Sequence, residues 1–204
     1  TKTRKQHNKH YRLCFQYDSE IPRYIHLGGE ALITLYDKNT NAKLAYLDDV
    51  IIEDSIEITR KINGEFTLKF EVLEDKLKCE YFESENYIAV DKFYFDIAYI
   101  EQTHSDSVTY RIECEHVTYR LIEEEKEFYT YDGTPAQMLS DILTGTDFTV
   151  GTVEPTTIIT FAIYEETNKL GLLQLLAYHT NSELDFEGFS VSLKNTLGRN
   201  RLSS

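Results

Sequence analysis

Two residues with the chemistry of a catalytic or metal site lie close together in this chain of 204 residues, Cys114 and His116. They are two positions apart, so both side chains point to one face if the segment is a β-strand. A thiol beside an imidazole is the arrangement of a cysteine nucleophile with its base, and it is also half of a zinc site. The sequence has no matching second pair, so we interpret both as structural residues of a strand.

A second candidate is the acidic run at residues 123–127, Glu-Glu-Glu-Lys-Glu, which could attract a cation. Consecutive side chains point in different directions on a strand or a helix, and the run lacks the spacing of a calcium-binding loop. We interpret it as a solvated face.

The remaining chemistry-bearing residues are scattered. Gly28, Gly29 and Gly151 do not form a phosphate-binding loop. Three histidines, His26, His104 and His179, each stand alone; the last is expected at a helix end, where a cation suits the helix dipole. We therefore assign no catalytic, cofactor-binding or metal-binding residue, and no cofactor.

Charge and composition restrict the classes of partner. A net charge of −14 argues against binding to nucleic acid or to an anionic membrane surface. Basic residues gather in the first twelve positions, which we interpret as a solvated tail in preference to a nucleic-acid arm. The longest apolar runs, such as 171–177, are too short to serve as a membrane anchor. Three cysteines, Cys14, Cys79 and Cys114, do not make a disulfide framework, and synthesis in a reducing cytoplasm fits best.

The elements that would position these residues are mostly strands. Apolar residues alternate with polar ones along 66–72, which is typical of a strand with one buried face. A three-residue loop at 62–64 would pair Ile58 with Leu68 and Ile56 with Phe70, and would need Gly64 in a left-handed conformation. Further strands are expected at 32–36, 43–47, 50–53, 87–90, 93–102 and 108–114, with turns at 37–41 and 104–107. Residues 11–17 could form one more.

The pattern changes at Tyr131, where two helices are expected. The first starts with Thr134 as N-cap, Pro135 at the first position and Gln137 closing a capping box, and it ends at Gly145. The second covers 168–179. Their buried residues should be Met138, Leu139, Ile142 and Leu143 in the first helix and Leu170, Leu173, Leu176 and Ala177 in the second. Short strands are expected at 148–150, 157–163, 183–187 and 189–193.

These elements predict an α+β protein, mainly antiparallel β, in which short strands form a barrel or sandwich beside a small α+β unit with two helices. We predict four parts: a basic N-terminal extension (1–30), an antiparallel β domain (31–130), a small α+β domain (131–194) and a C-terminal tail (195–204).

Four segments together resemble the N-terminal region of phage minor structural proteins, also called prophage endopeptidase tail or tail-associated lysin proteins. They are Ile-Thr-Leu-Tyr-Asp at 33–37 with Lys-Leu-Ala-Tyr-Leu at 43–47, the hairpin at 62–70, Cys-Glu-His-Val-Thr-Tyr-Arg-Leu at 114–121, and the capped-helix segment at 131–151. The resemblance covers about residues 32–197. Family members begin near Ile33, so residues 1–29 are an extension of uncertain origin, and 195–204 is a candidate truncation point.

The resemblance implies a baseplate-hub fold with barrel-like domains of tail-tube type, assembled as a homotrimer at the virion tail tip. It implies docking to the distal tail ring protein and to tape-measure or tail-tube proteins, with no specific nucleic acid and no membrane anchor. The family's endopeptidase domain lies C-terminal to this region, so we expect no enzyme activity. Two alternatives stay open. One is part of a peptidoglycan hydrolase, in which Cys114 and His116 or the acidic run at 123–127 would matter. The other is a module that binds envelope carbohydrate through some of the 15 tyrosines.

Overall fold

The computed structural model describes residues 33–52, 55–61, 63–84, 86–104 and 107–195, with the backbone of two further strands, β1 (Arg12–Phe15) and β2 (Arg23–His26). β1 and β2 pair with each other in antiparallel fashion. The rest of the N-terminal extension and nearly all of the C-terminal tail lie outside the described residues. Contacts divide the chain into two compact units, with the boundary along the sequence between His116 and Val117. Residues 62–64 group with the second unit. The four parts predicted from the sequence, with their bounds at residues 30, 130 and 194, stay a prediction.

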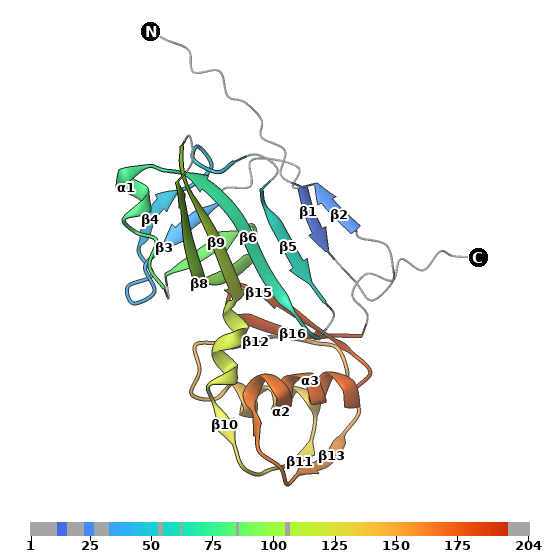
Figure 1. Ribbon diagram of the computed structural model, residues 1–204. Helices are drawn as coiled ribbons and strands as arrows, with labels where there is room; N and C mark the ends of the chain where they lie inside the picture. The colour runs from blue at the N-terminus through green and yellow to red at the C-terminus, as the bar shows by residue number, and fades with distance from the viewer. Residues whose placement is uncertain are drawn as a thin grey trace, which may run out of the picture. The chain divides into compact units, whose positions relative to one another are not determined.

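Unit 1 is built on a seven-stranded sheet in the order β4-β3-β7-β8-β9-β6-β5 (Figure 1). Every pairing is antiparallel, and the sheet curls into a half-barrel. The elements are β3 (Thr34–Tyr36), β4 (Lys43–Tyr46), β5 (Glu57–Arg60), β6 (Phe66–Leu73), α1 (Lys76–Cys79), β7 (Tyr87–Val90), β8 (Phe93–His104) and β9 (Val108–His116).

Alternation decides which face of this sheet is buried. On β6, Phe66, Leu68, Phe70 and Val72 are buried, while the residues between them are half-buried or exposed. The buried set fills the concave side of the curled sheet together with residues from β7, β8 and β9. The predicted period of two is confirmed.

The β5–β6 hairpin has the predicted register but not the predicted turn. Ile58 pairs with Leu68, and Lys61 donates its backbone N–H to the Glu65 carbonyl, which leaves a three-residue loop; the ladder starts at Glu57, so Ile56 lies just outside it. The left-handed residue is Asn63, with φ 52°, whereas the described glycines with positive φ are Gly145 and Gly188. The prediction for Gly64 was therefore wrong. Asparagine tolerates this conformation, and the Asn63 side chain accepts a hydrogen bond from the Leu184 N–H at 2.9 Å.

Two other expectations in unit 1 need correction. The segment predicted as a strand at 50–53 makes only an isolated bridge between Ile51 and Val72, and residues 53 and 54 lie outside the described residues. The charged stretch that follows β6 contains the short helix α1, which begins because the Asp75 carboxylate accepts hydrogen bonds from the N–H groups of Leu77 and Lys78.

Unit 2 is a small α+β unit. Its elements are η1 (Val117–Ile122), β10 (Glu125–Lys126), β11 (Tyr129–Gly133), α2 (Pro135–Leu143), β12 (Thr149–Val153), β13 (Ile159–Ile163), β14 (Thr167–Asn168), α3 (Lys169–His179), β15 (Glu183–Glu187) and β16 (Ser190–Lys194). Strands β12, β16 and β15 form one sheet, in which β12 runs parallel to β16. Two short ladders, β10–β14 and β11–β13, form a ribbon.

The two helices match their sequence signals closely. Thr134 caps α2 in a complete capping box with Gln137, and the helix ends just before Gly145, which has φ +79°. Asn168 caps α3. The buried face of α3 differs from the prediction, since Leu172 is buried and Leu170 is only half-buried. Leucines lie on nearly every side of this helix, so their spacing alone does not identify the inner face. The fold class, α+β with mainly antiparallel strands, is confirmed.

Candidate functional site

Cys114 and His116 lie on β9 and face the core of unit 1, as their spacing predicted. Cys114 is 2% exposed and His116 is fully buried. The imidazole of His116 stacks on the ring of Phe66, with centroids 4.3 Å apart, and meets Phe95 edge-on at 5.5 Å. Both side chains are thus packed as core residues.

Burial also sets the protonation of this pair. It raises the pKa of the Cys114 thiol well above its usual value, and the nearby carboxylates of Asp96 and Glu113 act in the same direction. It lowers the pKa of His116 well below its usual value, with a smaller effect from the Arg60 cation. A nucleophilic cysteine needs a lowered pKa and access to substrate, and Cys114 has neither.

The acidic run at 123–127 is exposed, as expected, but one of its members has a structural role. Glu124 pairs with the ammonium of Lys169 at 3.3 Å, and Lys169 is only 3% exposed. The same ammonium donates a hydrogen bond to the Thr144 carbonyl at 2.9 Å. Lys169 therefore links the start of α3 to the end of α2 and to the acidic run. A lysine directly after the capping Asn168 of an apolar helix was the available signal, and sequence reasoning missed it.

The other histidines do not converge on a site. His179 stacks on Phe161 at 5.1 Å at the end of α3, and His104 is exposed at the end of β8. The side chain of His26 lies outside the described residues. Within the described part of the chain, no group of three or more His, Cys, Asp and Glu side chains is placed to hold a metal ion. Of the helices in the described residues, none is long and apolar enough to cross a membrane.

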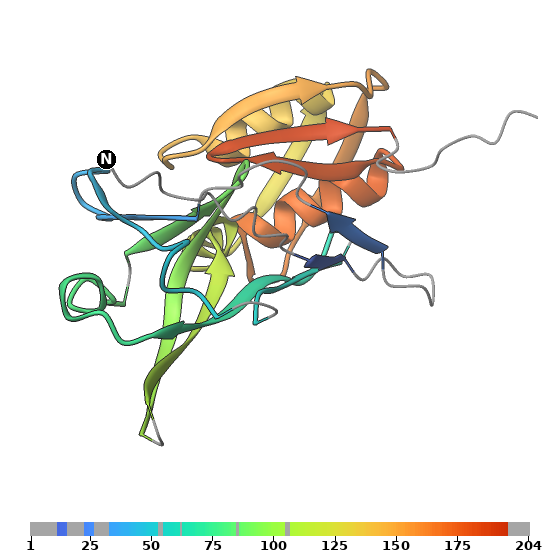
Figure 2. The same ribbon diagram turned by 90° about the horizontal axis from the view of Figure 1, so that it is seen from above.

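The surface feature that stands out is an open strand edge on β8. This strand has twelve residues, but β7 pairs only with its first four, from Phe93 to Asp96. On the other side β9 pairs along almost the whole length of β8, out to His104. In the described residues, no strand pairs with residues 98–104 on the side away from β9, a segment we call the β8 edge. Figure 2 shows the end of this hairpin projecting from the sheet.

The side chains along the β8 edge are accessible. A bulge between Ile97 and Tyr99 shifts the register, and Tyr99 is 54% exposed on the convex side. Beside it, Lys69 and Arg111 both form ion pairs with Glu113, so that side carries interspersed charges of both signs. An open edge offers unpaired backbone donors and acceptors to another strand, which is how extended chains add to a sheet. Such an edge can bind an extended segment through its backbone.

Comparison with known proteins identifies the class. Residues 32–116 match the family described as the prophage endopeptidase tail N-terminal domain, and this range ends at the same residue as unit 1. Residues 32–116 thus resemble a domain of a phage-tail family, and the resemblance found in the sequence is confirmed. That domain is the family's N-terminal tail domain and not its catalytic one. No curated protein matches the chain.

Solved structures of tail proteins share the fold. The prophage tail protein gp18 from Listeria monocytogenes EGD-e superposes with a TM-score of 0.66 at 16% identity, covering 80% of this chain and 50% of that one. A tail protein from Neisseria meningitidis MC58 gives 0.51 at 10% identity, covering 84% of this chain and 47% of that one. The 43 kDa tail protein of prophage MuSo2 from Shewanella oneidensis gives 0.51 at 14%, covering 83% and 57%. This chain spans about half the length of these proteins.

Proposed function

We propose that this protein is a structural component of a phage or prophage tail tip, of the baseplate-hub type. In this proposal it acts through self-association, as a ring of three copies, and by docking to the distal tail ring protein and to tape-measure or tail-tube proteins. The observation that carries the proposal is the match of residues 32–116 to the N-terminal tail domain. It supports a role in the virion tail and a role without catalysis.

Two structural observations support this role over the hydrolase alternative. Cys114 and His116, which an enzyme would need at a surface, are buried in the core of unit 1. The β8 edge, in contrast, is accessible and suits the addition of a strand from another chain. We propose that self-association uses this edge.

Light scattering of the purified chain over a range of concentrations tests the proposal. We expect a concentration-dependent increase in mass for the parent, and a smaller increase in Tyr99→Asp/Thr103→Asp. Aspartate is disfavoured in strands and would place two charges along the edge that an added strand has to cover. Both positions are exposed, so the fold should be kept. A matched control is Thr130→Asp on the exposed side of β11, which should associate like the parent.

Digestion and pelleting assays with purified peptidoglycan separate the alternatives. We expect neither cleavage nor co-sedimentation. Cleavage that disappears in Cys114→Ala/His116→Ala would refute the structural role, and co-sedimentation without cleavage would favour a carbohydrate-binding module. A parent that stays monomeric at every concentration would contradict the self-association.

A further inference from the structure

Two large aromatic side chains are exposed side by side in unit 2, where the β10–β14 ladder passes into the β11–β13 ladder. Phe128 and Tyr164 are 55% and 77% exposed, and their ring centroids are 5.4 Å apart. They lie in the connections between strands, Phe128 between β10 and β11 and Tyr164 between β13 and β14. Exposed apolar residues usually stand singly, whereas adjacent aromatic rings are typical of contact surfaces.

The core of unit 2 is filled without the rings of Phe128 and Tyr164. The neighbouring Tyr129 points the other way, is buried, and donates a hydrogen bond from its hydroxyl to Asp141 at 2.8 Å. Its ring packs against Phe161 on the opposite strand. The inner side of the ribbon is therefore already filled, and Phe128 and Tyr164 are left for contacts outside the unit.

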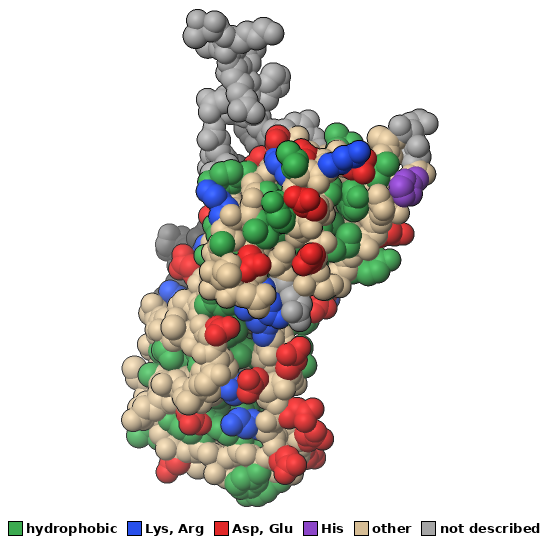
Figure 3. All heavy atoms as spheres, turned by 90° about the vertical axis from the view of Figure 1, so that its left-hand side faces the viewer, with side chains coloured by type: hydrophobic (Ala, Val, Ile, Leu, Met, Phe, Trp, Pro, Cys, Tyr) green, Lys and Arg blue, Asp and Glu red, His purple; other side chains and the backbone are tan. Residues whose placement is uncertain are grey.

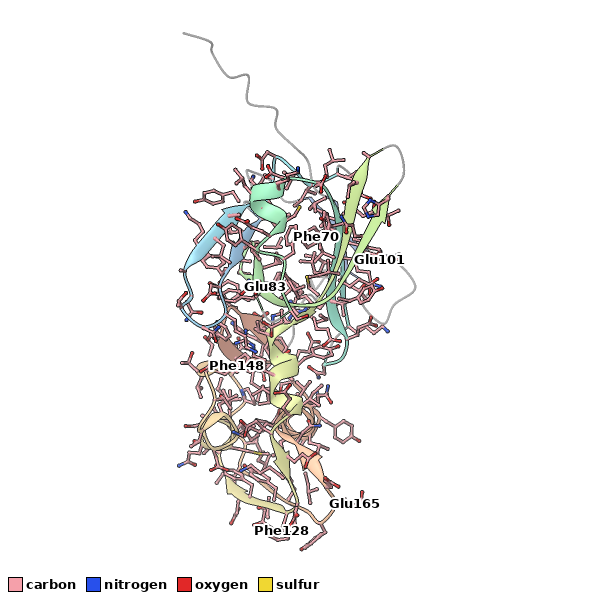
Figure 4. All side chains as sticks on the ribbon, turned by 60° about the vertical axis from the view of Figure 1, so that its left-hand side comes forward. Phe70, Glu83, Glu101, Phe128, Phe148 and Glu165 are labelled. Carbon is pink, nitrogen blue, oxygen red and sulfur yellow. The ribbon has the colours of Figure 1, made fainter. Side chains whose placement is uncertain are left out.

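Carboxylates flank the aromatic pair in the sequence. Residues 123–128 and 164–166 together contain six glutamates and one lysine, and all of them are exposed. Glu124 is paired with Lys169, and the other five glutamates are close to the two aromatic residues in the sequence. In Figure 4 Phe128 and Glu165 lie at the same end of unit 2, and in Figure 3 acidic side chains border a hydrophobic group there. We call Phe128, Tyr164 and these five glutamates the aromatic–acidic tip.

This composition selects a cationic partner. Lysine and arginine can form ion pairs with the glutamates, and their cationic groups are attracted to the faces of Tyr and Phe rings. An acidic or neutral segment would gain neither interaction and would leave the tip's charges facing one another.

The chain itself contains a segment with this chemistry. Residues 1–12 carry five Lys and Arg and two His, and the first acidic residue of the sequence is Asp18. The other 192 residues hold 16 Lys and Arg against all 35 Asp and Glu. Charge complementarity therefore pairs the strongest basic segment of the sequence with the aromatic–acidic tip.

We propose that the aromatic–acidic tip binds residues 1–12 of a second copy of this chain. The contact would be heterologous, joining two different surfaces, so each copy could bind one neighbour through its tip and another through its basic segment. This inference rests on the proposed self-association and names a second contact for it, separate from the β8 edge.

The first test uses a synthetic peptide of residues 1–12 with a fluorescent label, titrated with the full-length protein while anisotropy is recorded. We expect saturable binding that weakens about tenfold in Phe128→Ser/Tyr164→Ser. Raising the salt concentration from about 50 to about 300 mM should weaken it to a similar degree. The matched control is Tyr178→Ser, which removes a tyrosine that is 79% exposed at the far end of α3 and should bind like the parent. A peptide with every Lys and Arg replaced by Gln should not bind.

The second test decides whether the occupant belongs to another copy. Phe128→Ser/Tyr164→Ser lacks the tip but keeps the basic segment, and Lys2→Gln/Arg4→Gln/Lys5→Gln/Lys9→Gln lacks the segment but keeps the tip. Both should carry Tyr99→Asp/Thr103→Asp, so that the β8 edge does not contribute. We expect each protein to be monomeric alone and the mixture to form a one-to-one complex.

Three results would overturn the inference: no binding of the peptide, equal binding to the parent and to Phe128→Ser/Tyr164→Ser, or a mixture that stays monomeric. None of them bears on self-association through the β8 edge, which has its own variant and control. The two proposals can therefore fail separately.

Discussion

At the residue scale, the environment of a side chain decided its role. Cys114 and His116 have the types and spacing of a catalytic pair, yet both face the apolar interior of the curled sheet. Lys169 has the type of a surface residue, yet it is buried and held by Glu124 and the Thr144 carbonyl. A buried ammonium is tolerated only where such partners offset its desolvation. Residue type alone therefore did not identify the role in either case.

A buried neutral histidine predicts a pH dependence of stability. The pKa of His116 is lowered in the folded protein, so the unfolded chain binds the proton more readily. The contribution of neutral His116 to the free energy of unfolding is fully present above the unfolded pKa of about 6.5. It is lost as pH falls below that value, by up to about 1.4 kcal/mol per pH unit. His116→Phe keeps an aromatic ring against Phe66 and removes this titration.

Urea unfolding at several pH values between about 7.5 and 5 measures the effect. The carboxylates contribute equally to both proteins. The free energy of unfolding should therefore fall more steeply on acidification for the parent than for His116→Phe, because only the parent has the buried imidazole. Parallel pH profiles would show that His116 is not neutralised by its burial.

At the scale of elements, local chemistry set the ends of the helices in unit 2. The Thr134 hydroxyl accepts a hydrogen bond from the Gln137 N–H at 3.4 Å, and the Gln137 side-chain oxygen accepts one from the Thr134 N–H at 3.2 Å. These bonds involve residues three apart, so they were readable from sequence. The turn at 62–64 was not, because Asn63 is held by Leu184, which is 121 positions away.

The capping box predicts the cost of removing its hydroxyl. Thr134→Ala should lower the free energy of unfolding of unit 2 by about 1 kcal/mol, because an amide of the first helical turn loses its acceptor. Thr134→Ser is the control, since serine offers the same oxygen and should stay within a few tenths of a kcal/mol of the parent. Denaturant unfolding measures both. Equal midpoints for Thr134→Ala and the parent would mean that the cap does not stabilise the helix.

At the scale of the whole molecule, the contacts divide the chain into two compact units, and the boundary of unit 1 coincides with the end of the matched family domain at His116. Each unit has buried apolar residues of its own. We therefore expect each unit to open without the other.

Hydrogen exchange followed by mass spectrometry can test this independence. In Thr134→Ala, exchange should accelerate about fivefold in residues 117–195, in line with a loss of about 1 kcal/mol, and stay unchanged in β6, β8 and β9. Equal acceleration in both units would show that they open as one cooperative body.

The sequence by itself determined what depends on neighbours in the chain. Alternation placed the buried side of β6, the capping box placed the start of α2, and four segments in order indicated the tail family. Only the tertiary structure decided what depends on distant contacts: the left-handed residue of the β5–β6 loop, the inner face of α3, the burial of Lys169 and the open edge of β8. An edge exists only where a neighbouring strand ends first, and β7 stops pairing at Asp96 while β8 continues to His104. The sequence pattern of one strand does not predict where the strand beside it ends.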